Sequence, residues 1–173
     1  HFKLMGTDRN SYSKTDIEAT FMRMKDDHMQ NGQLKPAYNV QIAVENYFII
    51  HTYISNDRTD YNTLIPVLEN HKKYLKKFPQ EVTDDSGYSS EANLVYLKNN
   101  NIDSYIKLQM HEKMKTRAYK NDPGKFYNME KIITENGVHF ICKDGRKLQY
   151  ERSEYRNHNG YRSNFEVYAC KDC

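Results

Sequence analysis

Hydrophobic and polar residues alternate over residues 39–54 of the 173-residue chain. Val40, Ile42 and Val44 occupy every second position, and a run rich in β-branched and aromatic residues follows from Tyr47 to Ile54. A period of two is typical of a strand that buries one face. The pattern therefore predicts a β-hairpin.

The hydrophobic period changes to that of a helix after the hairpin. Apolar positions recur at i, i+3, i+4, i+7 and i+11, which predicts an amphipathic helix that Pro79 closes. These positions are Leu64, Val67, Leu68, His71 and Leu75. His71 is then most simply a histidine at the edge of the core.

A second helix and two further strands are predicted in the next stretch. Ser89 or Ser90 can cap a helix that carries Ala92 to Leu97, with strands over 81–85 and 102–108. Residues 38–108 thus follow the order β, β, α, β, α, β. This order predicts an α/β layer with mixed strand directions.

The two flanking segments carry weaker patterns. In residues 1–36, the spacing of Thr15 and Glu18 fits a capping box, but the methionines fit no single period, so a short helix and an extended arm both stay open. Residues 109–131 show no period. Beyond them, turn signals at Asn136-Gly137, Asp144-Gly145 and Asn159-Gly160 predict a four-stranded antiparallel β meander.

Composition limits the class of protein. Lys and Arg number 26 against 23 Asp and Glu, and the mean hydropathy of −0.97 is low, but 15 Tyr and 7 Phe argue against disorder. No apolar run approaches the roughly 18 residues of a membrane span, so we expect a soluble protein. Three cysteines without an export signal favour a reducing cytoplasm. The chain begins at His1, and we expect it to start within a longer protein.

The doublet Asp84-Asp85 offers the principal candidates for chemistry. It ends a predicted strand and precedes Gly87, at the sheet edge where open α/β sheets bind ligands, and such a carboxylate suits Mg²⁺ as a ligand. The ordinary alternative is a helix cap. Adjacent strand residues point to opposite faces, so only one of Asp84 and Asp85 can face a metal site.

Other acidic residues are less promising. Asp57 and Asp60 follow the second strand, where turn or cap roles are expected. Asp26, Asp27 and His28 are consecutive and cannot all converge on one ion, so a solvated loop is favoured.

The stretch from residue 107 to residue 131 is rich in lysine and interleaved with aromatic residues. It either follows a DNA backbone or forms a solvated linker. The candidate nucleic-acid-binding residues are Lys113, Lys115, Arg117, Lys120 and Lys125.

Several motifs in one order resemble DDE transposases of bacterial insertion sequences, in the 1182-type group. They are SKTDIEATFMRMK at 13–25, NGQLKPAYNVQIA at 31–43, NDRTD at 56–60, TLIP at 63–66 and DSGYSSE at 85–91. The resemblance covers nearly the whole chain. It implies an RNase H-like catalytic domain that cleaves and transfers DNA strands in transposition.

The resemblance also implies the site. Three carboxylates, two Asp and one Glu, hold two divalent ions, Mg²⁺ or Mn²⁺, and Asp85 matches the second Asp. Asp84 is then expected at the surface or as a cap. The first Asp of the family lies on a strand upstream of His1 and the Glu lies on a helix downstream of Cys173. We therefore expect a partial chain that is inert alone, with an incomplete RNase H-like mixed sheet and exposed strand edges.

Three segments follow from this interpretation. Residues 1–36 form an arm, 37–108 the central part of the catalytic domain, and 109–173 a basic linker with an inserted β meander. Cys170 and Cys173 resemble the start of a Cys-rich segment, and we expect free thiols here, with Cys142 a buried strand residue. DNA is the expected partner, and the complete protein is a candidate homo-oligomer. The alternative function is a non-catalytic nucleic-acid-binding or interaction module.

Overall fold

The computed structural model describes residues 2–5, 7, 9–24, 29–135, 137–158 and 161–170. The chain divides into two compact units, unit 1 (residues 1–107) and unit 2 (residues 108–173), and each is considered by itself. Within the described ranges, no helix has both the length and the apolar character needed to cross a membrane. Asp26, Asp27, His28 and Cys173 lie outside the described residues.

Unit 1 begins with a short helix, α1 (Phe2–Met5), and an antiparallel pair, β1 (Thr20–Arg23) with β2 (Leu34–Ala37). The capping-box helix is wrong, because the neighbouring side chains of Ser13 and Asp16 close tight turns around Thr15 and Glu18 instead. Ser13 Oγ accepts the backbone N–H of Asp16, and Asp16 Oδ1 accepts that of Glu18. Such local bonds compete with helix formation. The described residues of this segment form turns and the β1–β2 pair, and its role as an arm stays a prediction.

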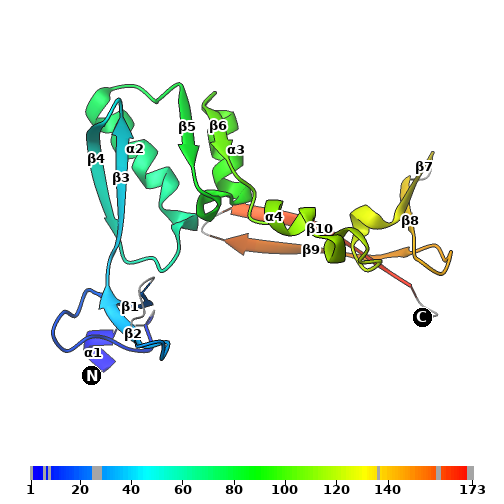
Figure 1. Ribbon diagram of the computed structural model, residues 1–173, viewed down its shortest axis with the longest axis horizontal. Coiled ribbons are helices and arrows are strands. Elements are labelled where there is room, and N and C mark those ends of the chain that lie inside the picture. The colour runs from blue at the N-terminus through cyan, green and yellow to red at the C-terminus, as the bar shows by residue number, and fades with distance from the viewer. Residues whose placement is uncertain are drawn as a thin grey trace. The chain divides into compact units, whose positions relative to one another are not determined.

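The predicted hairpin is confirmed as β3 (Asn39–Glu45) and β4 (Phe48–Ser55), which are antiparallel (Figure 1). The two residues of its turn, Asn46 and Tyr47, both have positive φ, at 49° and 69°. Such a turn matches the right-handed twist of the strands.

Two helices follow the hairpin. The helix α2 (Leu64–Leu75) ends where Lys76 adopts the left-handed conformation and donates its backbone N–H to Lys72 O. It therefore stops before Pro79, which does not close it. The helix α3 (Glu91–Asn99) is capped by Ser90, whose Oγ accepts the N–H of Asn93.

The strands β5 (Glu81–Asp84) and β6 (Asp103–Ile106) precede and follow α3 in the sequence, and they pair in parallel. The order β, β, α, β, α, β is thus confirmed. The single mixed sheet is not, because β3 pairs only with β4, and β5 only with β6, among the described residues. Leu64 and Leu68 of α2 pack with Leu97 of α3 and Ile102 to form the core of unit 1.

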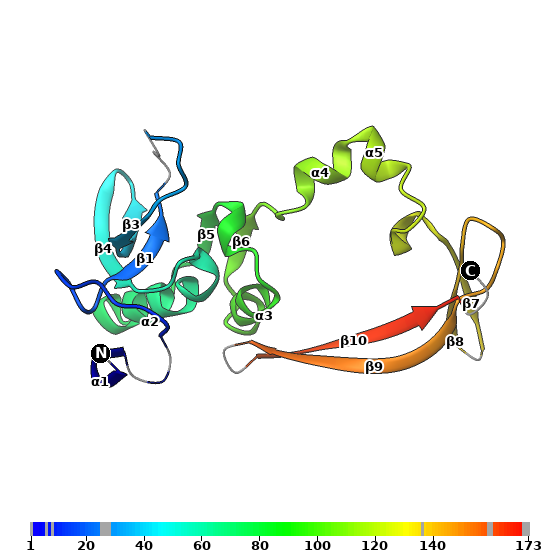
Figure 2. The same cartoon turned by 90° about the horizontal axis from the view of Figure 1, so that it is seen from below.

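Unit 2 contains short helices and two hairpins. The first part holds α4 (His111–Lys115), α5 (Arg117–Lys120) and one turn of 3₁₀ helix, η3 (Phe126–Asn128). Next, β7 (Glu130–Thr134) pairs with β8 (Gly137–Ile141), and β9 (Gln149–His158) pairs with β10 (Tyr161–Ala169). Figure 2 shows β9 and β10 as a long two-stranded ribbon.

The four predicted strands therefore occur in meander order but do not form one four-stranded sheet. Only one bridge, Ile141 with Lys147, links the two hairpins among the described residues. The reason is the tight turn that follows β8, in which Cys142 donates its N–H to Arg146 O. Leu148 then donates its N–H to Phe140 O, and β9 begins at Gln149 without pairing to the described residues of β8.

Aromatic side chains link the elements of unit 2. A chain of ring contacts joins α5, η3, β8 and both long strands, with centroids 4.7 to 6.2 Å apart. Its members are Tyr119, Tyr127, Phe126, Phe140, Tyr168 and Tyr150. Tyr119 is buried, whereas Phe126, Tyr127 and Tyr150 are exposed, so the rings supply edge and stacking contacts between elements more than a closed core.

Candidate functional site

Asp85 follows the last residue of β5 and opens a 3₁₀ turn, η2 (Ser86–Tyr88). Its Oδ1 accepts the backbone N–H of Gly87 at 2.6 Å, and its side chain is exposed. The helix-capping role is therefore present in the structure. This capping bond does not test whether Asp85 is also a metal ligand, and that role stays a prediction.

Asp84 lies on the opposite side of the strand end and differs from expectation. It is half-buried, and its Oδ2 has no hydrogen-bond partner among the described residues. Burial raises the pKa of its carboxyl group, and the charge of Asp85 raises it further. Asp84 is thus neither a surface residue nor a cap, because the side chain at this face of β5 points inward.

Asp60 approaches the Asp85 turn from the loop after β4. It starts the 3₁₀ turn η1 (Asp60–Asn62), and a Cβ placed on Gly87 would lie 3.0 Å from Asp60 Oδ2 and 2.9 Å from Asp85 Oδ1. Glycine leaves the space that these two carboxylates occupy. Asp57 has the expected turn role, since it accepts the Ser55 hydroxyl at 2.9 Å.

A polar network joins Asp60 to β3 and to η2. Asp60 Oδ1 accepts the amides of Asn39 at 2.8 Å and Gln41 at 3.0 Å, and Gln41 accepts the hydroxyl of Tyr88. Burial raises the pKa of Tyr88 to about 12, with Asp60, Asp84 and Asp85 adding to the shift. Tyr88 therefore stays protonated and acts as a donor within this acidic cluster.

Asn93 is a site-positioning residue that the sequence pattern did not reveal. It is 1% exposed, and its Nδ2 donates to the carbonyl oxygens of Tyr61, at 3.0 Å, and Tyr88, at 2.9 Å. These carbonyls belong to the turns that carry Asp60 and follow Asp85. The available signal was a polar residue four positions before Leu97, on the buried side of α3.

A cleft of about 850 Å³ lies beside this cluster and is lined by residues of β3, α2 and β5. Its lining includes Val67, His71, Asp84 and Tyr88. Burial lowers the pKa of His71, and His51, with its ring 5.9 Å away, lowers it further. His71 is half-buried, which fits its predicted place at the edge of the core.

The described residues do not by themselves form a metal site. Among them, no group of three His, Cys, Asp or Glu side chains is arranged to hold an ion. Asp60 and Asp85 supply oxygen donors of the kind that Mg²⁺ prefers, but one oxygen of each already accepts hydrogen bonds. No reaction step through a metal follows from this part of the chain alone.

The five basic candidates lie in one short region of unit 2. Lys113, Lys115, Arg117 and Lys120 are exposed on α4 and α5, while Lys125 is half-buried just before η3. Lys115 lies 3.4 Å from Glu112 and Lys125 lies 3.8 Å from Asp122, which are weak exposed pairs. The region brings these cations together, and whether they contact DNA stays a prediction.

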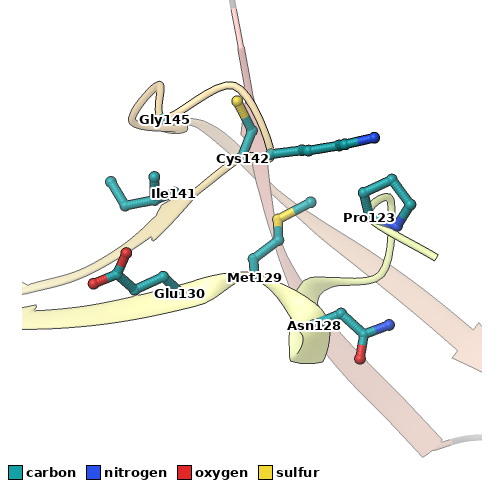
Figure 3. Close-up of a pocket in the computed structure, with 8 residues that line it drawn as sticks. Pro123, Asn128, Met129, Glu130, Ile141, Cys142 and Gly145 are labelled. Atoms are coloured by element: carbon teal, nitrogen blue, oxygen red, sulfur yellow. The ribbon is translucent and has the colours of Figure 1, made fainter. Parts of the chain in front are cut away.

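The cysteines show no metal site in the described part of the chain. Cys170 is half-buried. Cys142 is also half-buried and follows β8, so its expected place within a buried strand is wrong. Figure 3 shows Cys142 and Met129 beside a small pocket of about 260 Å³. Its ionisable lining residues are Cys142, Glu130 and Lys143, and no hydrogen bond or ion pair joins these three side chains in the described structure.

Comparison with known proteins places the chain in a family. The model of the transposase DDE domain matches residues 9–170. No curated protein and no solved structure matches the chain. The family match spans both units, including the NDRTD and DSGY motifs that carry Asp60 and Asp85. The chain therefore belongs to the transposase DDE domain family.

Proposed function

We propose that this chain is the central part of an RNase H-like catalytic domain of a bacterial insertion-sequence transposase of the 1182-type group. The complete protein would cleave and transfer DNA strands with Mg²⁺ or Mn²⁺. The observation that carries the proposal is the family match over residues 9–170, with Asp85 at the carboxyl end of a parallel strand. Open α/β sheets place their ligands at such ends.

The cleft between β3 and β5 supports the fold. Both strands have an unpaired edge there among the described residues, and α2 covers the space between them. An added strand would join the two ladders into one mixed sheet and satisfy both edges. We propose that the strand bearing the first family Asp occupies this cleft, next to the end of β5.

The role of this chain in catalysis is to hold one carboxylate. Divalent ions in such enzymes activate the attacking hydroxyl and stabilise the leaving oxygen. Asp85 supplies one of the required carboxylates, and the polar network of Asp60, Gln41 and Tyr88 keeps its turn in place. The other two carboxylates would come from outside these 173 residues, so this chain alone is expected to be inert.

DNA is the substrate and the partner in this proposal. The basic region of α4 and α5 would contact phosphates, and the complete enzyme would act as a homo-oligomer on bacterial chromosomal DNA in the cytoplasm. The alternative is a non-catalytic nucleic-acid-binding module. It is favoured by one observation, the capping bond from Gly87 N–H to Asp85, which gives that carboxylate a structural role.

The test is nicking of the terminal DNA of the element in Mg²⁺ or Mn²⁺. The 173-residue chain is compared with a version extended in both directions along its gene. Cleavage by the extended protein alone supports the proposal. Salt-sensitive DNA binding by both proteins with cleavage by neither would replace it with the binding-module function.

A further inference from the structure

The outer half of the β9–β10 ribbon combines exposed arginines with exposed aromatic rings. The guanidinium of Arg162 lies 3.7 Å from the ring centroid of Tyr155, and that of Arg156 lies 4.9 Å from that of Phe165. Tyr155 is 57% exposed and Phe165 is 41% exposed. Stacking fixes each guanidinium plane while its N–H edge stays able to donate.

The strand register places these two pairs on opposite faces. Arg162 is opposite Asn157, and Arg156 is opposite Ser163, so the arginines occupy adjacent rungs of the ladder. Side chains on adjacent rungs point to opposite sides. Each face of the ribbon therefore presents one stacked arginine.

Charge divides the ribbon into an inner and an outer half. Near the base, Arg152 contacts Glu154 at 2.6 Å and Glu151 at 2.8 Å, so its charge is compensated. In contrast, residues 155–165, which carry both stacked pairs, contain two arginines and no acidic residue. Glu154, which pairs with Phe165, contacts Arg152. In the described part of the chain, neither Arg156 nor Arg162 forms an ion pair with a carboxylate. The arginine near the base of the ribbon is thus paired with carboxylates, and the two arginines of the outer half are not.

The net charge of unit 2 favours a polyanionic partner. Unit 2 has thirteen Lys and Arg against nine Asp and Glu, a net charge of +4, whereas unit 1 has thirteen against fourteen, a net charge of −1. A duplex DNA is a dense polyanion, and its major groove accepts a two-stranded β-ribbon. A protein partner would need no such pair of uncompensated cations on two faces.

We propose that the outer half of the β9–β10 ribbon enters the major groove of duplex DNA. Arg156 and Arg162 then reach the phosphates of the two opposite strands, one from each face. Asn157 and Asn164, which lie on the Arg162 face, supply amides for phosphate or base edges. This inference rests on the proposed function, because it names the surface by which the transposase holds its DNA.

The test measures binding of the 173-residue chain to a labelled 30-base-pair duplex in EDTA by fluorescence anisotropy across a salt series. Arg156→Gln with Arg162→Gln should weaken binding about tenfold or more and lower the slope of log K against log salt by about 2, roughly one for each phosphate that is no longer neutralised. Arg152→Gln is the matched control and should change the dissociation constant less than about twofold.

A second variant distinguishes loss of charge from loss of structure. Arg156→Lys with Arg162→Lys keeps both charges, so it should keep the salt slope, and circular dichroism should show all variants folded. Three results would each overturn the inference: no binding by the wild type, unchanged binding by the double Gln variant, or tighter binding to a 30-nucleotide single strand. Because EDTA prevents cleavage, binding that depends on these arginines would stand even if no extended protein cuts DNA.

Discussion

Asp60 and Asp85, which are 25 positions apart in the sequence, both approach Gly87. A side chain at Gly87 would meet both carboxylates at about 3 Å, closer than ordinary contacts. We expect Gly87→Ala to displace one of them and to lower the free energy of unfolding by about 1 to 3 kcal/mol, as other overpacking changes do. Urea denaturation measures this loss.

A double-mutant cycle identifies the cause of that loss. If the clash with Asp60 is responsible, Gly87→Ala should cost less in an Asp60→Ala background than in the wild type. Strict additivity of the two changes would contradict the assignment. Gly124→Ala, whose Cβ would lie 3.3 Å from Asp122 Oδ1, is a control for which a smaller loss is expected.

Asn93 ties together the turns that carry this pair of carboxylates. Asn93→Ala would leave the carbonyls of Tyr61 and Tyr88 without their buried donor. The expected loss is about 2 to 3 kcal/mol in the free energy of unfolding. The exposed residue Asn99 of the same helix provides the control, since Asn99→Ala should change stability by less than about 0.5 kcal/mol. Equal effects of the two changes would refute the structural role.

The raised pKa of Asp84 makes stability depend on pH in a defined direction. The native state holds the Asp84 proton more tightly than the unfolded chain, where the pKa is 3.8. This contribution to stability is complete below that value and is lost as pH rises through the native pKa. At neutral pH the ionised, half-buried carboxylate is therefore unfavourable.

Asp84→Asn should accordingly stabilise the protein at pH 7, by about 0.5 to 1 kcal/mol because the group is only partly buried. The gain should disappear toward pH 3. Thermal unfolding at both pH values measures it, with Glu81→Gln at the exposed start of β5 as the control. A gain that is the same at both pH values would exclude ionisation of Asp84 as the cause.

Local patterns in the sequence predicted the elements of unit 1 well. The alternation at Val40, Ile42 and Val44 and the helical spacing from Leu64 to Leu75 are strong periodic signals, and both elements occur. The apolar face of β3 is nevertheless the exposed one, with these three residues 53 to 61% exposed, while Gln41 on the other face is buried. Such patterns could not predict whether these strands form a single mixed sheet, because strand pairing depends on contacts between residues far apart in the sequence. In unit 2, period alone did not distinguish a four-stranded meander from two hairpins, which depend on the turn after β8.

The candidate site was predicted only in part. The DSGY motif pointed to Asp85, but the positions of Asp60, Gln41 and Asn93 around it depend on contacts over 19 to 47 residues of sequence. Asp84 shows the limit of the strand rule. Alternation correctly separated it from Asp85 but did not indicate which of the two faces is buried.

Asp85 is expected to be essential in the extended protein. Asp85→Asn keeps the size of the side chain and its carbonyl oxygen, which can still accept the Gly87 N–H, but removes the charge that a divalent ion requires. Strand cleavage should fall by at least about a thousandfold, which corresponds to roughly 4 kcal/mol in the activation barrier. DNA affinity should stay within about twofold. Retained cleavage would exclude Asp85 as a catalytic residue.

The basic region of α4 and α5 gives the last prediction. Lys113, Lys115 and Lys120 are all exposed, so replacing the three with Gln should not affect packing. If they contact phosphates, the slope of log K against log salt should fall by about 3 and duplex affinity should drop at least tenfold.

The control removes the same charge elsewhere. Lys73, Lys76 and Lys77 lie at the end of α2 and just beyond it, and they are also exposed. Replacing these three with Gln changes the net charge of the protein equally, so any effect of net charge alone would appear in both variants. A selective loss in the first variant locates the contact at α4 and α5. Equal losses would instead show that this region is a solvated linker.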